Sequence, residues 1–561
     1  MPFVPDTQNK EFQDALNLIQ YTRQSVFLTG KAGTGKSTFL RYICGHTKKK
    51  HVVLAPTGIA AINAGGSTLH SFFKLPFYPL LPDDPNFSLQ RGRIHEFFKY
   101  TKPHRKLLEE LELVIIDEIS MVRADIIDAV DRILRVYSRN LREPFGGKQL
   151  LLVGDVFQLE PVVKGDEREI LNRFYPTPYF FSARVFGQID LVSIELQKVY
   201  RQTDPVFVGV LDHIRTNTAG AADLQLLNTR YGSQIEESEA DMYITLATRR
   251  DTVDSINEKK LAELPGESIT FEGVIEGDFP ESSLPTSQEL VLKPGAQIIF
   301  IKNDFDRRWV NGTIGVIAGI DEEEETIYVI TDDGKECDVK RDSWRNIRYR
   351  YNEKTKEIEE EVLGSFTQYP IRLAWAITVH KSQGLTFSRV VIDFTGGVFA
   401  GGQAYVALSR CTSLDGIQLK KPINRADIFV RPEIVNFAGR FNNRQAIDKA
   451  LKQAQADVQY AAAARAFNKG DMEECLEQFF RAIHSRYDIE KPVPRRLIRR
   501  KLGIINTLKE QNKKLKEQMR EQQERLRQYA HEYLLMGNEC ITQAHDIRAA
   551  LANYDKALSL D

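Results

Sequence analysis

The chain has few cysteines and no long apolar run. Its five cysteines lie far apart, without the paired spacing of a zinc site or of a disulfide framework. This pattern is typical of a protein from a reducing compartment. No apolar stretch approaches the ~20 residues of a membrane span, and residues 1–7 lack the features of a signal peptide. We therefore expect a soluble protein without membrane partners, cytoplasmic in a bacterium or nuclear in a eukaryote.

An excess of charge of either sign is also missing. The 561 residues include 76 lysines and arginines against 77 aspartates and glutamates. Net charge therefore gives no argument for a nucleic-acid partner, and any such surface must come from local clustering. The length exceeds what one hydrophobic core organises and predicts about three to five domains.

A glycine-rich loop between an apolar strand and a helix is the clearest motif that is present. Its spacing is that of a phosphate-binding loop, in which glycine amides wrap the phosphates and a lysine reaches the β- and γ-phosphates. The predicted nucleotide contacts are Gly30, Ala32, Gly33, Thr34, Gly35, Lys36, Ser37 and Thr38. Ser37 is also a predicted Mg²⁺ ligand. An ordinary strand-to-helix turn is the alternative interpretation.

Two further apolar strands end in residues that hydrolysis of a Mg²⁺-bound nucleotide needs. Asp117 and Glu118 follow residues 113–116, and we assign Asp117 to the metal and Glu118 to the attacking water. Gln158 follows residues 150–153 and is placed to sense the γ-phosphate. Hydrolysis also needs positive charge opposite the phosphoryl group, which Arg201 and Arg410 offer.

Short apolar runs alternate with helical stretches up to about residue 199, which predicts a parallel sheet covered by helices. A second α/β segment follows, with strands predicted at residues 243–247, 297–301 and 389–393. Proline- and aromatic-rich sequence near 70–110 predicts a small insert in the first lobe. Alternating segments near 305–365 predict a small antiparallel barrel or sheet in the second. The expected boundaries are 1–190, 191–440 and a helical tail at 441–561.

As an ordered set, these motifs resemble the superfamily-one helicases, and most closely the Pif-type branch. The set runs from the phosphate loop through Ala55-Pro-Thr-Gly-Ile-Ala-Ala61, Gly66-Ser-Thr-Leu-His70, Ile116-Asp-Glu-Ile-Ser-Met121, Gly154-Asp-Val-Phe-Gln158, Tyr200-Arg-Gln202, Thr378-Val-His-Lys-Ser-Gln-Gly384 and Tyr405-Val-Ala-Leu-Ser-Arg410. The Pro144-Phe-Gly-Gly147 run and the Asp-rich helix before it are similar to that branch's signature. The resemblance covers about residues 10–425.

The resemblance implies two tandem RecA-like P-loop lobes, with an SH3-like barrel inserted in the second and a wedge in the first. It implies that Arg201 and Arg410 are arginine fingers, that Gly384 lies at the nucleotide and that ATP with Mg²⁺ is the cofactor. The adenine-selecting glutamine would be Gln8 or Gln13, neither at the usual spacing. It also implies contacts to single-stranded DNA through Thr57, Gly58, Thr68, His70, Phe72, Phe157, His380 and Lys381. Among these residues, the aromatic rings of Phe72 and Phe157 are expected to stack on bases.

After about Arg440 the composition becomes that of helices only. Residues 491–528 hold thirteen lysines and arginines against four glutamates, a net charge of +9, and Leu508, Leu515, Met519 and Leu526 form one apolar stripe. A coiled-coil arm packed on its own protein is the first interpretation, and a nucleic-acid or partner surface the second. Residues 462–483 and 533–560 resemble tetratricopeptide hairpins.

The sequence therefore predicts an ATP-dependent helicase acting on single-stranded and tailed duplex DNA, monomeric in isolation. The resemblance implies 5′-to-3′ movement, activity on G-quadruplexes or R-loops, and roles in DNA repair and telomere maintenance. A RecD-like or conjugative helicase is one alternative. An ATP-switched scaffold that binds nucleic acid but no longer unwinds it is the other, with the tail recruiting partners.

Overall fold

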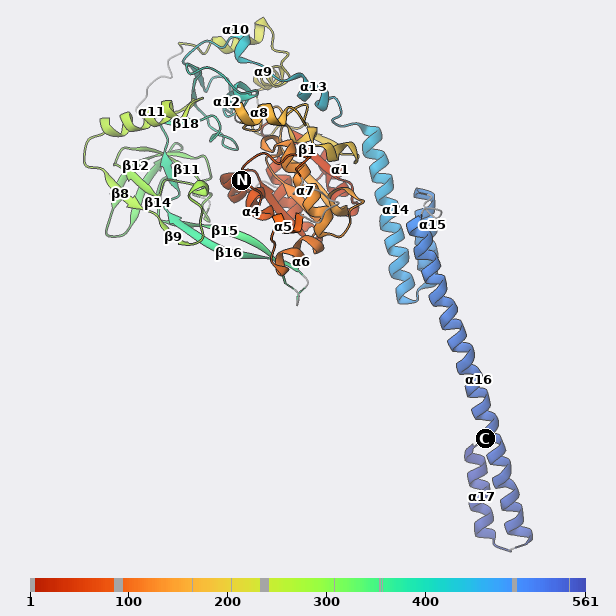
Figure 1. Ribbon diagram of the computed structural model, residues 1–561. Helices are drawn as coiled ribbons and strands as arrows, with labels where there is room; N and C mark the ends of the chain where they lie inside the picture. Colours follow the sequence, from red (N-terminus) through yellow and green to blue (C-terminus); the bar gives the residue numbers. More distant parts are fainter. Residues whose placement is uncertain are drawn as a thin grey trace. The chain divides into compact units, whose positions relative to one another are not determined.

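The computed structural model describes residues 6–84, 94–163, 165–202, 204–232, 242–306, 308–352, 355, 357–486, 492–543 and 545–560. The chain divides into two compact units, Met1–Val458 and Gln459–Asp561 (Figure 1). Part of the insert predicted near 70–110, residues 85–93, lies outside the described residues. None of the described helices combines the length and the apolar character that crossing a bilayer requires.

A six-stranded parallel sheet forms the first lobe. Its strands, in the order β3-β2-β4-β5-β1-β6, are β1 Val26–Gly30, β2 His51–Ala55, β3 Ser67–Thr68, β4 Leu113–Ile116, β5 Gln149–Val153 and β6 Val192–Leu196. Because β6 pairs with β1 along its whole length, the lobe extends past the predicted boundary at residue 190. The strands are apolar throughout because helices cover both faces.

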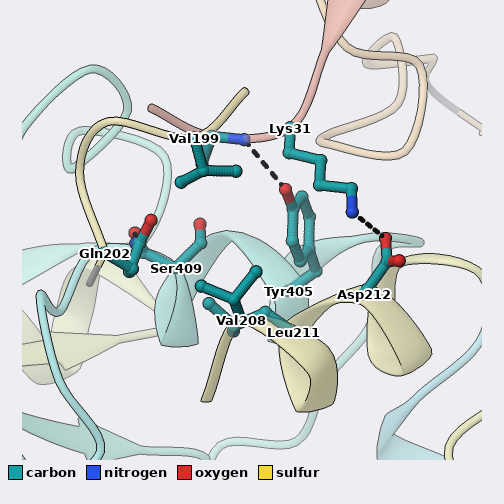
Figure 2. A pocket seen from close by; sticks show the side chains of 9 residues that line it. Lys31, Val199, Gln202, Val208, Leu211, Asp212, Tyr405 and Ser409 are labelled. Carbon is teal, nitrogen blue, oxygen red and sulfur yellow. Dashed lines mark hydrogen bonds and ion pairs between the residues drawn. The ribbon is translucent and has the colours of Figure 1, made fainter. Parts of the chain in front are cut away.

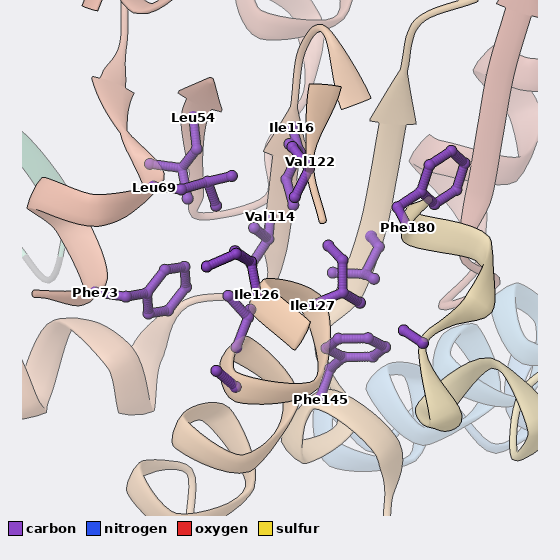
Figure 3. Packing of buried hydrophobic residues seen from close by; sticks show 14 of the residues in the cluster. Leu54, Leu69, Phe73, Val114, Ile116, Val122, Ile126, Ile127, Phe145 and Phe180 are labelled. Atoms are coloured by element: carbon purple, nitrogen blue, oxygen red, sulfur yellow. The ribbon is translucent and has the colours of Figure 1, made fainter. Parts of the chain in front are cut away.

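The helical elements of this lobe connect the strands and cover the sheet. They are α1 Lys10–Tyr21, α2 Lys36–His46, α3 Gly58–Ala64, α4 Leu69–Phe73, α5 Ile94–Phe97, α6 Lys102–Glu110, η2 Ile119–Met121, α7 Ala124–Tyr137, η3 Pro144–Gly147, α8 Gly165–Leu171, η4 Phe180–Ser182 and η5 Arg184–Gly187. On one face, Val114 and Ile116 pack toward Ile126 and Ile127 of α7 (Figure 3). The opposite face packs on α1 and α2.

The Asp-rich helix α7 and the Pro-Phe-Gly-Gly run form one structural unit. Asp131 accepts the backbone N–H of Phe145 at 2.5 Å and pairs with Arg135, while Asp128 accepts the Tyr175 hydroxyl at 2.9 Å. Gly146 adopts a left-handed conformation (φ 64°) against the Leu134 carbonyl, where a Cβ would overlap. Buried Asp131 therefore anchors the loop that precedes β5, and Asp128 anchors the segment around Tyr175.

The second lobe contains a four-stranded parallel sheet. Its order is β18-β7-β19-β20, with β7 Ile244–Ala247, β18 Ala376–Thr378, β19 Val390–Asp393 and β20 Ile417–Leu419. Its helical elements are α9 Pro205–Arg215, α10 Ala221–Asn228, α11 Arg250–Glu263, α12 Gln403–Leu408 and η7 Arg425–Asp427, and α13 Pro432–Ala438 follows them in the chain. The strand predicted at 297–301 is β11 Gln297–Phe300, which lies in another, antiparallel sheet, so its assignment to this sheet was wrong.

Antiparallel strands make up the insert of the second lobe. They form a five-stranded sheet (β14-β13-β12-β11-β17), a three-stranded sheet (β15-β16-β9) and a pair (β10-β8). The remaining bounds are β8 Ile269–Glu272, β9 Val274–Gly277, η6 Glu281–Ser283, β10 Glu289–Leu292, β12 Ile314–Asp321, β13 Thr326–Thr331, β14 Glu336–Val339, β15 Asp342–Asn352, β16 Glu357–Gln368 and β17 Ile371–Leu373. The insert thus begins before the predicted residue 305. Tyr349 of β15 enters the first lobe's core, where its hydroxyl accepts the N–H of Val53.

After the second lobe the chain returns to the first one. Phe437 of α13 stacks on Phe181 with ring centroids 4.4 Å apart. Asn442 exchanges hydrogen bonds with the backbone of Glu195 in β6, and Ile447 of α14 (Arg444–Lys469) is buried against α1 and the sheet. The predicted tail boundary at 440 was therefore too early, and the first unit ends at Val458.

A truncation pair tests this boundary. A chain ending at Val458 should keep its ATPase activity and melting temperature, whereas one ending at Arg440 should melt lower. The shorter chain loses Ile447 from a buried site, and such a deletion costs about 2–5 kcal/mol. Differential scanning calorimetry of both truncations, with the full chain as control, measures the difference. Equal melting temperatures would show that residues 441–458 do not support the first lobe.

The second unit is entirely helical in its described residues. It comprises the end of α14, then α15 Met472–Ser485, α16 Pro492–Thr542 and α17 Ile547–Leu560. Tyr460 of α14 packs on Phe479 of α15, and Tyr554 of α17 packs over Gly537 of α16. These two helical hairpins are joined by the long helix α16 and are not stacked on each other as tetratricopeptide repeats would be.

Candidate active site

The order of strands in the first sheet brings the predicted catalytic residues together. Strands β4, β5 and β1 are neighbours, and all run parallel. Their carboxyl ends therefore place Asp117 and Glu118, Gln158 and the phosphate loop side by side. These residues come from segments far apart in the sequence. The candidate nucleotide site is thus assembled at the carboxyl ends of the inner strands of the sheet.

The phosphate loop runs from Gly30, the last residue of β1, to Lys36, the first of α2. Gly33 and Gly35 adopt left-handed conformations with φ of 79° and 89°. Lys36 donates from Nζ to the carbonyls of Gly30 and Lys31, at 2.7 and 3.0 Å, and burial lowers its pKa. Ser37 and Thr38 lie in the first turn of α2, where free backbone N–H groups favour anions.

Two carboxylates face this loop after β4. The backbone N–H of Asp117 donates to the Leu54 carbonyl at 2.8 Å, which continues the sheet pairing and fixes the position of its side chain. Glu118 adopts a left-handed conformation with φ of 48°, and its N–H donates to Oδ1 of Asp117. Burial, together with the charge of Asp117, raises the pKa of Glu118 to about 7. Such a carboxylate is suited to take a proton from water.

The residues present fit a magnesium ion held by the protein and a nucleotide together. Ser37 supplies a hydroxyl and Asp117 a carboxylate, the oxygen ligands that Mg²⁺ prefers. Among the described residues, no group of three or more His, Cys, Asp or Glu side chains forms a closed metal site. That donor set agrees with a cation that takes its other ligands from phosphates and water.

The second lobe contacts the phosphate loop directly. The backbone N–H of Ala32 donates to the Tyr405 hydroxyl at 3.0 Å, and Lys31 pairs with Asp212 of α9 at 3.0 Å (Figure 2). The N–H of Tyr200 donates to the Gly33 carbonyl at 2.9 Å. A Cβ on Gly33 would overlap with the side chain of Arg201. The loop is therefore one wall of an interface whose other wall is the second lobe.

The two predicted arginine fingers both lie at this interface. Arg410 is buried and bonds only neutral oxygens, including the carbonyls of Val406 and Ser382, and Arg201 donates to the Ser409 carbonyl at 3.3 Å. Within the described part of the chain, neither has a carboxylate within 4.0 Å. Burial and the nearby charge of Arg201 lower the pKa of Arg410 to about 9. Two such cations favour an anion between them.

Arg215 is a residue of this interface that sequence reasoning missed. It comes from α9 of the second lobe, is only 3% exposed, and pairs with Asp155 at 3.1 Å and Glu195 at 2.8 Å. Its guanidinium lies 4.4 Å from the centre of the Phe157 ring. Phe157 is therefore buried beneath an arginine, and its predicted stacking on DNA bases was wrong. The only sequence signal is an arginine at the end of an amphipathic helix.

Most predicted DNA contacts come after β-strands that differ from those preceding the nucleotide contacts. Thr57 follows β2, Thr68 ends the edge strand β3, and His380 and Lys381 follow β18, the edge strand of the second sheet. Gly58 lies against Ser283 of the insert, where a Cβ would overlap. The carboxyl ends of the strands thus separate a nucleotide site near the centre from candidate DNA contacts toward the edges.

Each histidine of this set lies beside an exposed phenylalanine. His70 stacks on Phe77 with centroids 5.0 Å apart and planes 9° from parallel, and Phe77 is 83% exposed. His380 lies 6.5 Å from Phe399, which is 60% exposed. Phe72, in contrast, is buried between Phe73 and Tyr349, so its predicted stacking on bases was wrong. Burial lowers the pKa of both histidines, which keeps them neutral.

Two predicted nucleotide contacts have separate roles in the structure. Gln13 lies in α1 and donates from its side chain to the Thr7 carbonyl. Gly384 adopts a left-handed conformation (φ 79°) between Ser382 and Leu385, whose carbonyls both accept from Arg410. Gly384 therefore shapes the loop that holds an arginine finger. Whether Gln13 or Gln8 selects adenine stays a prediction.

Comparison with known proteins identifies the family. Residues 4–209 match the model of the PIF1-like helicases. The chain is 30% identical to the Pif1 helicase of Bdellovibrio bacteriovorus over 449 residues, covering 79% of this chain and 94% of the relative. The chain belongs to the PIF1-like helicase family. The human PIF1 helicase is 34% identical over 408 residues, 71% of this chain, but the match spans only 58% of the human protein.

Solved PIF1-like structures share the fold of the first unit. A crystal structure of Bacteroides Pif1 in complex with ADP-AlF4 superposes with a TM-score of 0.70 at 42% identity, covering 77% of this chain and 96% of that one. Bacteroides Pif1 bound to single-stranded DNA gives a TM-score of 0.56 at 41% identity, with 78% and 97% coverage. The PIF1-like resemblance noted from the sequence motifs is confirmed.

Proposed function

We propose that this chain is an ATP-dependent DNA helicase that translocates 5′-to-3′ on single-stranded DNA and unwinds duplexes. G-quadruplexes and R-loops are further proposed substrates. One observation carries the proposal: the phosphate loop of one lobe faces two arginines of the other, the buried Arg410 and the half-buried Arg201. In such an arrangement, the γ-phosphate controls whether the lobes close. The family membership and the DNA complexes of Bacteroides Pif1 support DNA as the partner.

In the proposed hydrolysis step, the nucleotide phosphates replace the contacts that close the loop in this structure. Lys36 turns from the carbonyls of Gly30 and Lys31 to the phosphates, and the Ala32 N–H exchanges the Tyr405 hydroxyl for a phosphate oxygen. Ser37 and Asp117 would hold Mg²⁺, which would supply positive charge to neutralise the phosphates. Glu118 accepts a proton from the attacking water, and Arg201 and Arg410 stabilise the charge of the transition state.

Movement along DNA follows from the same interface. Gln158 and Phe157 lie against Gly402 at the start of α12, the helix that leads to Arg410, and a Cβ on Gly402 would overlap with their carbonyls. A change at the γ-phosphate sensor therefore shifts α12 and the second lobe. The loops after β2 and β3 belong to the first lobe and the loop after β18 belongs to the second. Each cycle of nucleotide binding and hydrolysis therefore changes the distance between their contacts with single-stranded DNA.

Strand displacement on tailed duplexes tests the proposal. The chain should unwind a duplex with a 5′ single-stranded tail when ATP and Mg²⁺ are present, and should leave a blunt or 3′-tailed duplex paired. Unwinding from the 3′ tail alone would refute the polarity. DNA-stimulated hydrolysis without unwinding of either substrate would favour the ATP-switched scaffold. Parallel assays on a G-quadruplex and on an R-loop test the further substrates.

The exposed phenylalanines beside the two histidines should contribute to DNA affinity. Phe77→Ala and Phe399→Ala should each weaken binding of single-stranded DNA by about 5- to 150-fold, since stacking of one base contributes about 1–3 kcal/mol. Fluorescence anisotropy without nucleotide measures this affinity. Tyr21→Ala, which removes an exposed ring at the end of α1, is the matched control and should have no effect. Equal losses in all three variants would contradict a stacking role.

A further inference from the structure

No other described helix of the second unit covers the middle of α16 (Figure 1). Every residue from Asn506 to Arg525 is exposed, although both ends of the helix are packed. At one end Lys501 lies 4.7 Å from the centre of the Phe467 ring, and at the other Tyr554 covers Gly537. Helices in water depend largely on packing of an apolar face. A bare helical stretch of about 30 Å is therefore incomplete without a partner.

This stretch has the repeat of a coiled coil. Its apolar stripe follows alternating steps of three and four residues, at Ile505, Leu508, Asn512, Leu515, Met519, Gln522, Leu526 and Tyr529. In heptad terms, Leu508 and Leu515 occupy d positions and Asn512 and Met519 occupy a positions. Leu508, Leu515 and Met519 are each 58% exposed. Nothing among the described residues fills the role of the second strand.

We propose that this stripe pairs with the same stripe of a second copy of the chain, in a parallel two-stranded coiled coil. Leucine at d together with one asparagine at a is the pattern that selects a parallel dimer, because the two asparagines bond each other only in that register. Asn512 occupies such a position. The chain expected from its sequence to be a monomer is thus a dimer through its tail.

Charges beside the stripe agree with parallel pairing of two copies. The e positions hold Lys509 and Lys516, and the g positions hold Gln511 and Gln518. In a parallel dimer each g position faces an e position of the partner helix, so Gln511 faces lysine and no two lysines meet. Antiparallel pairing sets e positions against each other and brings lysines together. Parallel pairing therefore avoids like-charge contacts.

The charge distribution also favours a protein partner over nucleic acid. Residues 505–526 hold six lysines and arginines against four glutamates, a net charge of +2, so most of the +9 lies nearer the start of the helix. Glu510, Glu517 and Glu524 recur every seven residues on the face opposite the stripe. A phosphate backbone would be repelled by this row of glutamates. The stripe itself carries no charge.

Sedimentation equilibrium of the full chain without DNA tests the proposal. From nanomolar to tens of micromolar, the mass should rise from 64.1 kDa to twice that value. The double variant Leu508→Lys/Leu515→Lys should remain at 64.1 kDa throughout and keep its ATPase activity. Leu535→Lys is the matched control, because Leu535 is 50% exposed but lies off the stripe, and it should dimerise like the unchanged chain.

Two further variants test the geometry. Asn512→Leu should give a mixture with species larger than a dimer, because the selecting asparagine is gone. Gln522→Cys, at a d position, should form a disulfide-linked dimer under mild oxidation, to an extent that the unchanged chain does not reach. Cross-linking no greater than that of the unchanged chain would overturn the parallel register.

Other outcomes would overturn the interface itself. A mass of 64.1 kDa at every concentration would exclude self-association. A dimer that persists in the double lysine variant would exclude the stripe as the interface. Fluorescence anisotropy with single-stranded DNA tests the competing explanation, in which the middle of α16 binds nucleic acid. A monomeric chain that loses DNA affinity in Lys513→Glu/Lys514→Glu would assign the bare stretch of α16 to nucleic acid and refute the dimer.

Discussion

Replacing Lys36 with alanine is expected to abolish ATP hydrolysis while DNA binding without nucleotide persists. Lys36 is a half-buried cation of the phosphate loop, and its two carbonyl partners are neutral. Its removal takes away the charge that binds the β- and γ-phosphates. The candidate DNA contacts follow β2, β3 and β18 and do not depend on this side chain. Steady-state hydrolysis and DNA anisotropy on the same preparation measure both effects.

Glu118→Gln should separate nucleotide binding from chemistry at the same site. The variant should still bind ATP but hydrolyse it about 10²- to 10⁴-fold more slowly, the usual contribution of a general base. Binding of a fluorescent ATP analogue and single-turnover hydrolysis distinguish the two steps.

Lys31→Ala is the matched control for Lys36, because Lys31 lies in the same loop but pairs with Asp212 at the surface of the site. A surface ion pair contributes about 0–1 kcal/mol, so hydrolysis should fall little. If Lys36→Ala lost DNA binding together with hydrolysis, in a folded protein, the proposed separation of the two sites would be refuted.

Arg410→Lys is expected to reduce the rate of hydrolysis by about 10³- to 10⁵-fold, the range that arginine fingers contribute. Lysine keeps the charge but lacks the planar fork that bonds the Val406, Ser382 and Leu385 carbonyls while facing the phosphate loop. Nucleotide binding should change much less than the rate, since the finger acts mainly on the transition state. Single-turnover kinetics with saturating DNA measures the loss.

Arg425→Lys provides the comparison for Arg410→Lys. Arg425 also belongs to the second lobe and bonds Asn217 and the Ile428 carbonyl, away from the phosphate loop. Its replacement should leave the rate unchanged. A melting temperature that falls in Arg410→Lys, with a rate close to that of the unchanged chain, would show that Arg410 only holds the loop around Gly384 in place.

The sequence alone was sufficient where chemistry is local. The phosphate loop, the Asp117 and Glu118 pair and Gln158 each occupy a few consecutive residues at the end of an apolar strand, and the structure places them on neighbouring strands. The order of the strands in the sheet brings the motifs together. Each motif is nevertheless recognisable from sequence alone, because metal and phosphate ligation needs specific side chains at short spacing. Arg201 and Arg410 were identified by family resemblance, and the structure places both at the interface of the lobes.

Only the tertiary structure decided which aromatic side chains are exposed and which residues of the two lobes contact each other. Phe72 and Phe157 are aromatic and could stack on bases by residue type alone, but both side chains lie in the core. Phe77 and Phe399, in contrast, are exposed. Arg215 reaches Asp155 only because two lobes meet.

The boundaries of the structural units also depended on contacts between segments that are distant in the sequence. The sequence by itself determined the order of the motifs, the reaction they serve and the helical character of the tail, because those follow from residue type and spacing. Only the tertiary structure showed that residues 441–458 belong to the first unit and that the middle of α16 is bare. Packing partners come from elsewhere in the chain, and a local pattern does not specify which surface they cover.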